Sequence, residues 1–194
     1  MDKISYALGI SMASNLKSTG INNLNLSEFQ KGFADIIEGR KPSMEIDEAQ
    51  MLLGQYFNKL QQEADARNKE IGEKFLAENK KREGIITTAS GLQYEILTAG
   101  NGPKPKATDT VKCHYEGRLI DGTVFDSSIR RGEPATFGVG QVIAGWVEAL
   151  QLMPVGSKWR LYIPSDLAYG AHGAGDIIGP NAALIFDVEV LQII

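Results

Sequence analysis

The sequence predicts an α+β protein with three parts: an all-helical N-terminal module, one long linking helix, and a C-terminal antiparallel sheet wrapped on a short helix. Apolar residues recur at helical spacing in the first part of the chain and alternate with period two after Gly84. Helices and strands in separate blocks are typical of this fold class. We therefore divide the chain into residues 1–46, 47–83 and 84–194, and expect the first part of the linking helix to pack in the N-terminal module.

The composition excludes several classes of protein. With 43% hydrophobic and 23% charged residues, the chain has the composition of a globular protein. Its 20 basic and 24 acidic residues, a net charge of −4, provide no basic module for nucleic acid. No apolar run reaches the roughly 18 residues of a membrane span. The single cysteine excludes an internal disulfide. We expect a cytoplasmic protein (periplasmic or exported if a signal peptide has been removed) with no nucleic-acid and no membrane partner.

The N-terminal module is expected to contain two amphipathic helices. The first covers residues 3–18, and a second starts at Ser27, with Gln30 as its capping-box partner, and ends near Gly39. About 60 residues can barely bury such apolar faces by themselves. We therefore expect a homodimer formed through residues 1–60, which makes this part a dimerisation module.

The linking helix is predicted to start after a cap at Asp47 and to continue to Glu83, a length of about 55 Å. Its apolar face thins beyond Gln61, where acidic residues precede basic ones by four positions. Such pairs support an isolated helix; they are Glu63/Arg67, Asp65/Lys69, Glu70/Lys74 and Glu78/Arg82. No apolar heptad persists past Leu60, so we interpret the helix as a solvated rod and not as a coiled coil.

The C-terminal part is predicted to hold five strands and one short helix. The strands are residues 92–97, 110–119, 123–125, 157–163 and 183–193. Between them, residues 142–150 have the spacing of a helix face and include Trp146. Gly145 is expected to leave room for a ligand on the indole. Taken alone, this stretch predicts a core helix with a buried tryptophan.

The sequence shows no residue pattern for a metal site, a phosphate-binding loop or a covalent catalyst. Two histidines and one cysteine do not make a zinc site. Cys113 and His114 are adjacent on a predicted strand and therefore point to opposite faces. Gly138 and Gly140 lack the rest of a phosphate-binding loop. We expect no metal and no cofactor.

The aromatic residues of the C-terminal part are the candidate site. They could line one apolar pocket, with Asp126 and Arg131 at its edge, or they could simply be core. The glycine-rich loop 170–175, next to Tyr169, favours the pocket. The candidates are Tyr115, Phe125, Phe137, Val142, Ile143, Trp146, Tyr169, Ile178 and Phe186.

Several motifs together resemble the FKBP-type peptidyl-prolyl cis-trans isomerases. They are Tyr115-x-Gly117, the run from Asp121 to Ser128, the run from Val142 to Trp146, the run from Leu152 to Gly156, and the run from Leu167 to Gly170. This likeness covers residues 92–194. The helical front is similar to the two-domain, dimeric bacterial branch typified by the macrophage infectivity potentiator.

The resemblance implies a role for each candidate residue. Trp146 would be the floor of the pocket, and the N–H of Ile143 would contact a substrate carbonyl. The catalytic set would be Asp126, Tyr169, Phe125 and Trp146; the substrate-binding set would be Tyr115, Phe137, Val142, Ile143, Ile178, Phe186 and Arg131. Whether Asp126 acts on the amide or orders Tyr115 and Arg131 stays open. Ala135 stands where many single-domain relatives carry a phenylalanine.

The implied function is isomerisation of X–Pro bonds in peptides and folding polypeptides, by non-covalent stabilisation of the twisted amide. Macrolide inhibitors of the family are expected to bind in the same pocket. The alternative is a dimeric chaperone or peptide-binding adaptor with incidental isomerase activity. A fragment beginning near Gly84 is expected to keep the activity of the full chain on short peptides.

Overall fold

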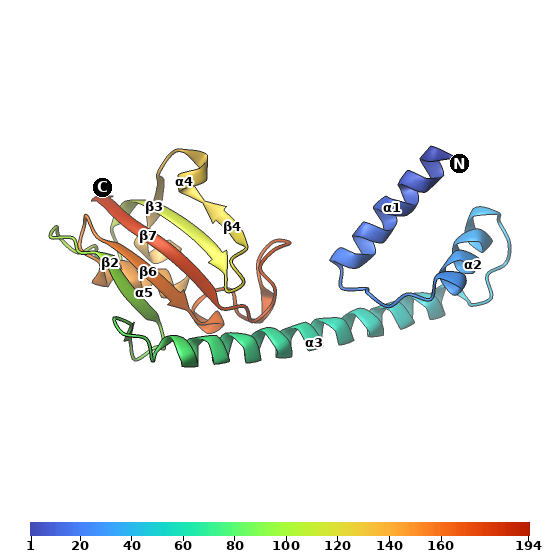
Figure 1. Ribbon diagram of the computed structural model, residues 1–194, viewed down its shortest axis with the longest axis horizontal. Coiled ribbons are helices and arrows are strands. Elements are labelled where there is room, and N and C mark those ends of the chain that lie inside the picture. The colour runs from blue at the N-terminus through green and yellow to red at the C-terminus, as the bar shows by residue number, and fades with distance from the viewer. The chain divides into compact units, whose positions relative to one another are not determined.

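The computed structural model describes all 194 residues, in two compact units, Met1–Leu60 and Gln61–Ile194. The first unit contains helices α1 (Lys3–Ser18) and α2 (Leu26–Ile37) and the start of α3 (Ile46–Asn79). The rest of α3 belongs to the second unit, together with all of the strands (Figure 1). The long helix already includes Asp47, the predicted cap, because it starts at Ile46, and it ends four residues before Glu83, the predicted end.

The helix starts of the first unit follow polar caps. The Asp2 carboxylate accepts the N–H of Ile4 at 3.0 Å, which caps α1. The cap of α2 is Asn25, whose side-chain oxygen accepts the N–H groups of Ser27 and Glu28 at 3.1 and 3.3 Å. The prediction of Ser27 as the helix start is therefore wrong by two residues, because Asn25 already provides a capping oxygen.

The first unit buries very little of its apolar surface. Ile21 is the only buried hydrophobic residue of this unit. The exposed large hydrophobic residues come from all three helices and include Ile4, Leu8, Leu26, Phe33, Ile36, Ile37, Met51 and Leu53. A single copy of this unit therefore lacks a core of its own.

The second unit is built on a seven-stranded antiparallel sheet in the order β1-β2-β6-β7-β3-β4, with β5 also paired to β3. Its strands are β1 Ile86–Thr87, β2 Gln93–Thr98, β3 Thr110–Leu119, β4 Val124–Ser127, β5 Ala135–Gly138, β6 Lys158–Ile163 and β7 Leu184–Ile193. The five predicted strands are confirmed within two residues at either end. Strands β1 and β5 were not predicted, because two and four residues are too few to show alternation, and β5 lacks an Asp-Gly turn such as the one that precedes the equally short β4.

Helix α5 (Ala144–Leu152) packs on the sheet and closes the core (Figure 1). It starts two residues later than predicted, so Val142 and Ile143 are extended residues before the helix. A Cβ on Gly145 would lie 2.6 Å from Ile163. This glycine is therefore required by the contact between helix and strand, and the expectation that it makes room for a ligand is wrong. The unit also contains helix α4 (Ser128–Arg131) and the short 3₁₀ turns η1 (Val139–Gln141), η2 (Ser165–Leu167) and η3 (Gly170–His172).

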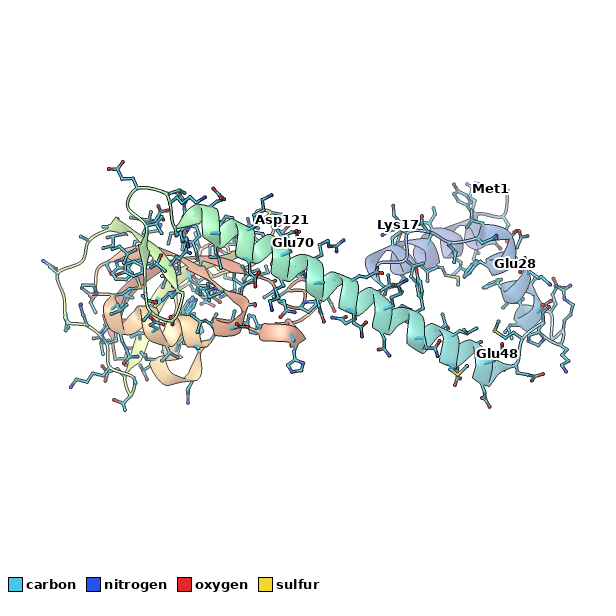
Figure 2. The ribbon with its side chains drawn as sticks, turned by 90° about the horizontal axis from the view of Figure 1, so that it is seen from below. Met1, Lys17, Glu28, Glu48, Glu70 and Asp121 are labelled. Carbon is cyan, nitrogen blue, oxygen red and sulfur yellow. The ribbon has the colours of Figure 1, made fainter.

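The second half of α3 is docked on the sheet and is not a solvated rod. Asn79 is only 3% exposed, and its side-chain nitrogen donates to the side-chain oxygen of Gln93 at 2.8 Å. Gln93 in turn donates to the backbone oxygen of Leu76 at 2.9 Å. The rings of Phe75 and Tyr162 are 6.0 Å apart. In Figure 2, Glu70 marks the stretch of α3 that belongs to this unit.

The charged residues of α3 also differ from the prediction. Glu78 pairs with Lys81 at 2.7 Å, three residues away, and not with Arg82. Arg82 donates to the hydroxyl of Tyr162 at 2.9 Å and pairs with Glu95 at 3.3 Å. Because α3 ends at Asn79, Arg82 lies beyond the helix and bonds the sheet, so part of the charge pattern serves docking.

We predict that Asn79→Ala destabilises the second unit by about 1–3 kcal/mol, because it leaves the buried side-chain oxygen of Gln93 without a donor. Alanine is the better helix former, so weakening of the helix does not explain a loss. Urea unfolding followed by tryptophan fluorescence measures it, since Trp146 and Trp159, both in this unit, are the only tryptophans of the chain. The exposed control Glu73→Ala should leave stability within experimental error, and an equally stable Asn79→Ala protein would contradict the docking role.

Candidate active site

A cavity of about 370 Å³ opens between the sheet and the start of α5. Strands β3, β4, β5 and β7, the turn η1 and the residues before α5 all contribute to it. Its lining residues are Tyr115, Phe125, Asp126, Phe137, Gln141, Val142, Ile143, Trp146, Tyr169 and Phe186. Most of these side chains are apolar, and the polar groups are few, which is the usual character of a small-ligand site.

The indole of Trp146 is the centre of this arrangement. It is 4% exposed, and its nitrogen has no hydrogen-bond acceptor within the chain. The rings of Tyr115, Phe137 and Phe186 surround it edge-on, with centroids 5.4, 5.5 and 5.3 Å away and interplanar angles of 85, 79 and 83°. Edge-to-face contacts of this kind are favourable and fix the relative orientation of the rings.

Gly117 of β3 makes room for the rings on the other wall. A Cβ there would lie 2.6 Å from the rings of both Phe125 and Phe186. These two rings are 5.5 Å apart at an angle of 79°. In the sheet, Gly117 is directly opposite Asp126 on β4 and Phe186 on β7. The glycine therefore brings the aromatic wall and the carboxylate to the same level of the sheet.

A hydrogen-bonded triad forms the polar edge of the cavity. The hydroxyl of Tyr115 donates to the carboxylate of Asp126 at 2.5 Å, and the guanidinium of Arg131 bonds both Asp126 and the Tyr115 oxygen. Burial alone would raise the pKa of Asp126, but the hydrogen bonds from Tyr115 and Arg131 hold that pKa below its usual range. Burial and the carboxylate raise the pKa of the Tyr115 phenol. Asp126 is therefore a carboxylate and Tyr115 a neutral phenol at pH 7.

Two donors at the cavity are free for a ligand. The backbone N–H of Ile143, just before α5, has no acceptor within the chain. The hydroxyl of Tyr169 also has no partner, and this residue is 38% exposed. Both groups belong to residues that line the cavity.

The structure places most, but not all, of the candidate residues around the cavity. Ile178 is not in the lining; it is buried in the core and forms a backbone bridge with Ala174. Arg131 bonds Asp126 but is not in the lining either. Gln141 lines the cavity but was not singled out from the sequence, where a glutamine between Gly140 and Val142 gives no signal of its own.

Cys113 and His114 take no part in the cavity. Burial raises the pKa of the Cys113 thiol to about 12, which makes it inert as a nucleophile. One ring nitrogen of His114 lies 3.1 Å from the hydroxyl of Ser128. The chain contains no group of three or more His, Cys, Asp or Glu residues that could hold a metal ion.

An antiparallel sheet packed on one short helix, with an aromatic cavity between them, defines the FKBP type of peptidyl-prolyl isomerase domain. The family model for the FKBP-type peptidyl-prolyl cis-trans isomerase matches residues 102–191. The model for the domain amino-terminal to that isomerase matches residues 1–96. The chain therefore belongs to the FKBP-type peptidyl-prolyl cis-trans isomerases and is an enzyme of that class.

Individual relatives match over nearly the whole chain. The FKBP-type 22 kDa peptidyl-prolyl cis-trans isomerase of Escherichia coli (strain K12) is 45% identical over 98% of this chain and 94% of its own length. The Outer membrane protein MIP of Legionella longbeachae is 43% identical over 99% of this chain and 85% of its own. The crystal structure of FkpA from Escherichia coli matches with a TM-score of 0.79 and 34% identity, covering 98% of this chain and 95% of that one.

These comparisons confirm the predicted family and fold class and favour the isomerase over the chaperone or adaptor alternative. They do not support the expected cytoplasmic location, since one relative carries an outer membrane name. None of the helices combines the length and hydrophobicity needed to cross a membrane.

Proposed function

We propose that the chain isomerises X–Pro bonds in the cavity around Trp146, without a cofactor or metal and with proline-containing peptides and folding polypeptides as substrates. The proline ring would lie on the indole, enclosed by the rings of Tyr115, Phe137 and Phe186. The observation that carries this proposal is the edge-on enclosure of one buried indole within an otherwise open cavity. A flat apolar floor with rigid walls suits a small saturated ring.

The mechanism follows from the electronic structure of the amide. Resonance opposes rotation about the X–Pro bond with a barrier near 18–20 kcal/mol. A planar amide is more dipolar than a twisted one, so removing water weakens the preference for planarity. An acceleration of about 10⁴ requires roughly 5.4 kcal/mol of stabilisation specific to the twisted state. A cavity lined mainly by aromatic rings provides such a dry environment.

The polar groups have separate tasks in this proposal. The N–H of Ile143 and the hydroxyl of Tyr169 hold substrate carbonyl groups, because both donors are otherwise free. Asp126 is engaged by Tyr115 and Arg131, which supports a role in ordering the wall of the cavity. Phe125 and Val142 complete the apolar lining. Ile178 acts indirectly, by closing the loop that follows Tyr169.

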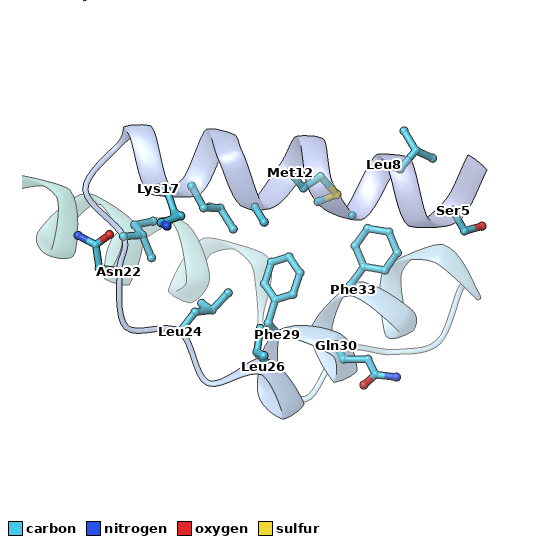
Figure 3. Close-up of a pocket in the computed structure, with 14 residues that line it drawn as sticks. Ser5, Leu8, Met12, Lys17, Asn22, Leu24, Leu26, Phe29, Gln30 and Phe33 are labelled. Atoms are coloured by element: carbon cyan, nitrogen blue, oxygen red, sulfur yellow. The ribbon is translucent and has the colours of Figure 1, made fainter. Parts of the chain in front are cut away.

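We also propose that the enzyme is a homodimer joined through residues 1–60, with residues 84–194 as the isomerase domain. Helices α1 and α2 enclose an apolar cleft of about 620 Å³. Figure 3 shows Phe29 and Phe33 of α2 pointing towards α1 across this cleft. A second copy of the same module would bury these faces, which one copy leaves exposed.

We predict that Tyr169→Phe lowers kcat/KM for a short prolyl peptide about tenfold, because the lost hydroxyl no longer holds the carbonyl of the twisted amide. A protease-free cis/trans assay measures this effect. Tyr94→Phe is the matched control, since the Tyr94 ring stacks on Trp159 away from the cavity. Equal turnover by the two variants would contradict the role given to Tyr169.

A second prediction concerns macrolide inhibitors, which we expect to bind in the same cavity. Ala135 lies on the same face of β5 as Phe137, two residues away. Ala135→Phe should tighten macrolide binding about tenfold to a hundredfold, as burial of a phenylalanine is worth roughly 1.5–3 kcal/mol. Calorimetric titration measures the affinity, and Thr136→Phe, on the opposite face of the strand, is the control. If both variants bind like the wild type, residue 135 does not face the ligand.

A third prediction concerns the dimer. Light scattering on the full chain should give twice the mass of one chain, and Phe33→Glu should halve it, because a charge would have to be buried in the interface. Lys31→Glu changes an exposed position of the same helix and should leave the dimer intact. A wild-type monomer, or a dimer unaffected by Phe33→Glu, would contradict the proposed interface.

A further inference from the structure

Helix α3 holds the segment that follows the loop next to the cavity. The side-chain nitrogen of Asn68 donates to the backbone oxygen of Pro180 at 2.9 Å. One turn later, Gly72 is buried against the same segment. A Cβ added to Gly72 would lie 3.2 Å from the Cβ of Ala183. Asn68 and Gly72 are four residues apart and so share one face of the helix. This face fixes the backbone of residues 179–183.

The fixed segment is bonded back to the cavity. The N–H of Asn181 donates to the oxygen of Gly170 at 2.8 Å. Asn181 has a φ of 53°, and no other residue except glycine has a positive φ. Asparagine adopts this left-handed conformation more readily than other residues with a side chain, so the turn at this position suits its sequence. Gly170 directly follows Tyr169, so this hydrogen bond fixes the chain next to a residue that lines the cavity.

The loop between these two points is closed on itself by a backbone bridge, and Ile178 near its end is buried in the core. Ala174 and Ile178 exchange backbone hydrogen bonds of 2.9 and 3.2 Å. The residues at its two exposed stretches, Ala171–His172 and Gly175–Ile177, have no hydrogen bond to the rest of the chain. Apart from the contacts of Ala174 and Ile178 with the core, the position of the loop therefore depends on its base, where Asn181 bonds Gly170 and Asn68 bonds Pro180.

We propose that Asn68 is a positioning residue for Tyr169. It holds Pro180 in place, which keeps the N–H of Asn181 directed at the oxygen of Gly170 and thereby fixes the backbone beside Tyr169. The linking helix thus contributes to the isomerase site, although none of its residues lines the cavity. The effect on activity rests on the proposed role of Tyr169. The anchoring itself does not.

The inference also changes the expectation for truncated proteins. A fragment beginning at Gly84 lacks Asn68 and Gly72 and should be less active than the full chain on a short peptide. The compact unit found here begins at Gln61 and retains both residues. Equal activity of a fragment starting at Gly84 would be expected only if the helix were a spacer without contacts to the isomerase part.

Two measurements on the full chain test the proposal. In Asn68→Ala, hydrogen exchange of the Asn181 amide should accelerate, because its hydrogen bond to Gly170 opens more often. The kcat/KM for a prolyl peptide should fall about fivefold, the size expected for loss of one hydrogen bond. Alanine is a better helix former than asparagine, so the substitution does not weaken α3. Lys69→Ala, an exposed position next to it, is the control for both measurements.

A double-mutant cycle separates positioning from a general loss of stability. If Asn68 acts through Tyr169, Asn68→Ala should have no further effect on kcat/KM in a Tyr169→Phe background. The same fivefold loss in both backgrounds, or an Asn181 exchange rate equal to that of the Lys69→Ala control, would overturn the proposal. Full activity of Tyr169→Phe would instead contradict the proposed function, and the exchange rate of Asn181 would still decide whether Asn68 anchors the segment.

Discussion

The edge-to-face packing of three aromatic rings around Trp146 is the constraint on which the rest of the site depends. Each ring comes from a different strand, β3, β5 or β7, so the sheet must bring these strands to one level for the indole to be enclosed. Only glycine fits at positions 117 and 145. The rings of Phe125 and Phe186 leave no room for a Cβ on Gly117, and the contact between helix α5 and strand β6 leaves none on Gly145. An open cavity above a rigid aromatic floor is the consequence.

The opposite face of the sheet has a different role, since it receives the linking helix. A network of charged side chains crosses it from Arg82 through Glu95, Arg160 and Asp187 to Arg118. Burial alone would raise the pKa of Asp187, but hydrogen bonds from Arg160 and Arg118 hold it below its usual range. The sheet therefore presents an aromatic cavity on one side and a charged docking surface on the other, and the segment 179–183 connects the two.

Much of this organisation could be predicted from the sequence because it follows hydrophobic period and turn chemistry. The four longer strands are visible as alternating apolar runs, β4 follows the Asp121-Gly122 turn, and the change from helices to strands falls near Gly84. The docking of α3 was not predicted, because Asn68 and Asn79 are polar and look solvated until their partners Pro180 and Gln93 are known. Strand β5 is short and has no Asp-Gly turn before it to mark its start, unlike β4. No sequence pattern marks Gln141 as a cavity residue, because only the fold places it in the lining.

The central claim is that prolyl isomerisation takes place on the indole of Trp146. NMR titration of the full chain with a short prolyl peptide tests it most directly, because the indole N–H of Trp146 has no acceptor within the chain and reports on its surroundings. We predict that this signal shifts as peptide is added, together with exchange peaks between the cis and trans forms of the peptide. Exchange peaks with an unchanged Trp146 signal, and shifts confined to the cleft between α1 and α2, would contradict the account.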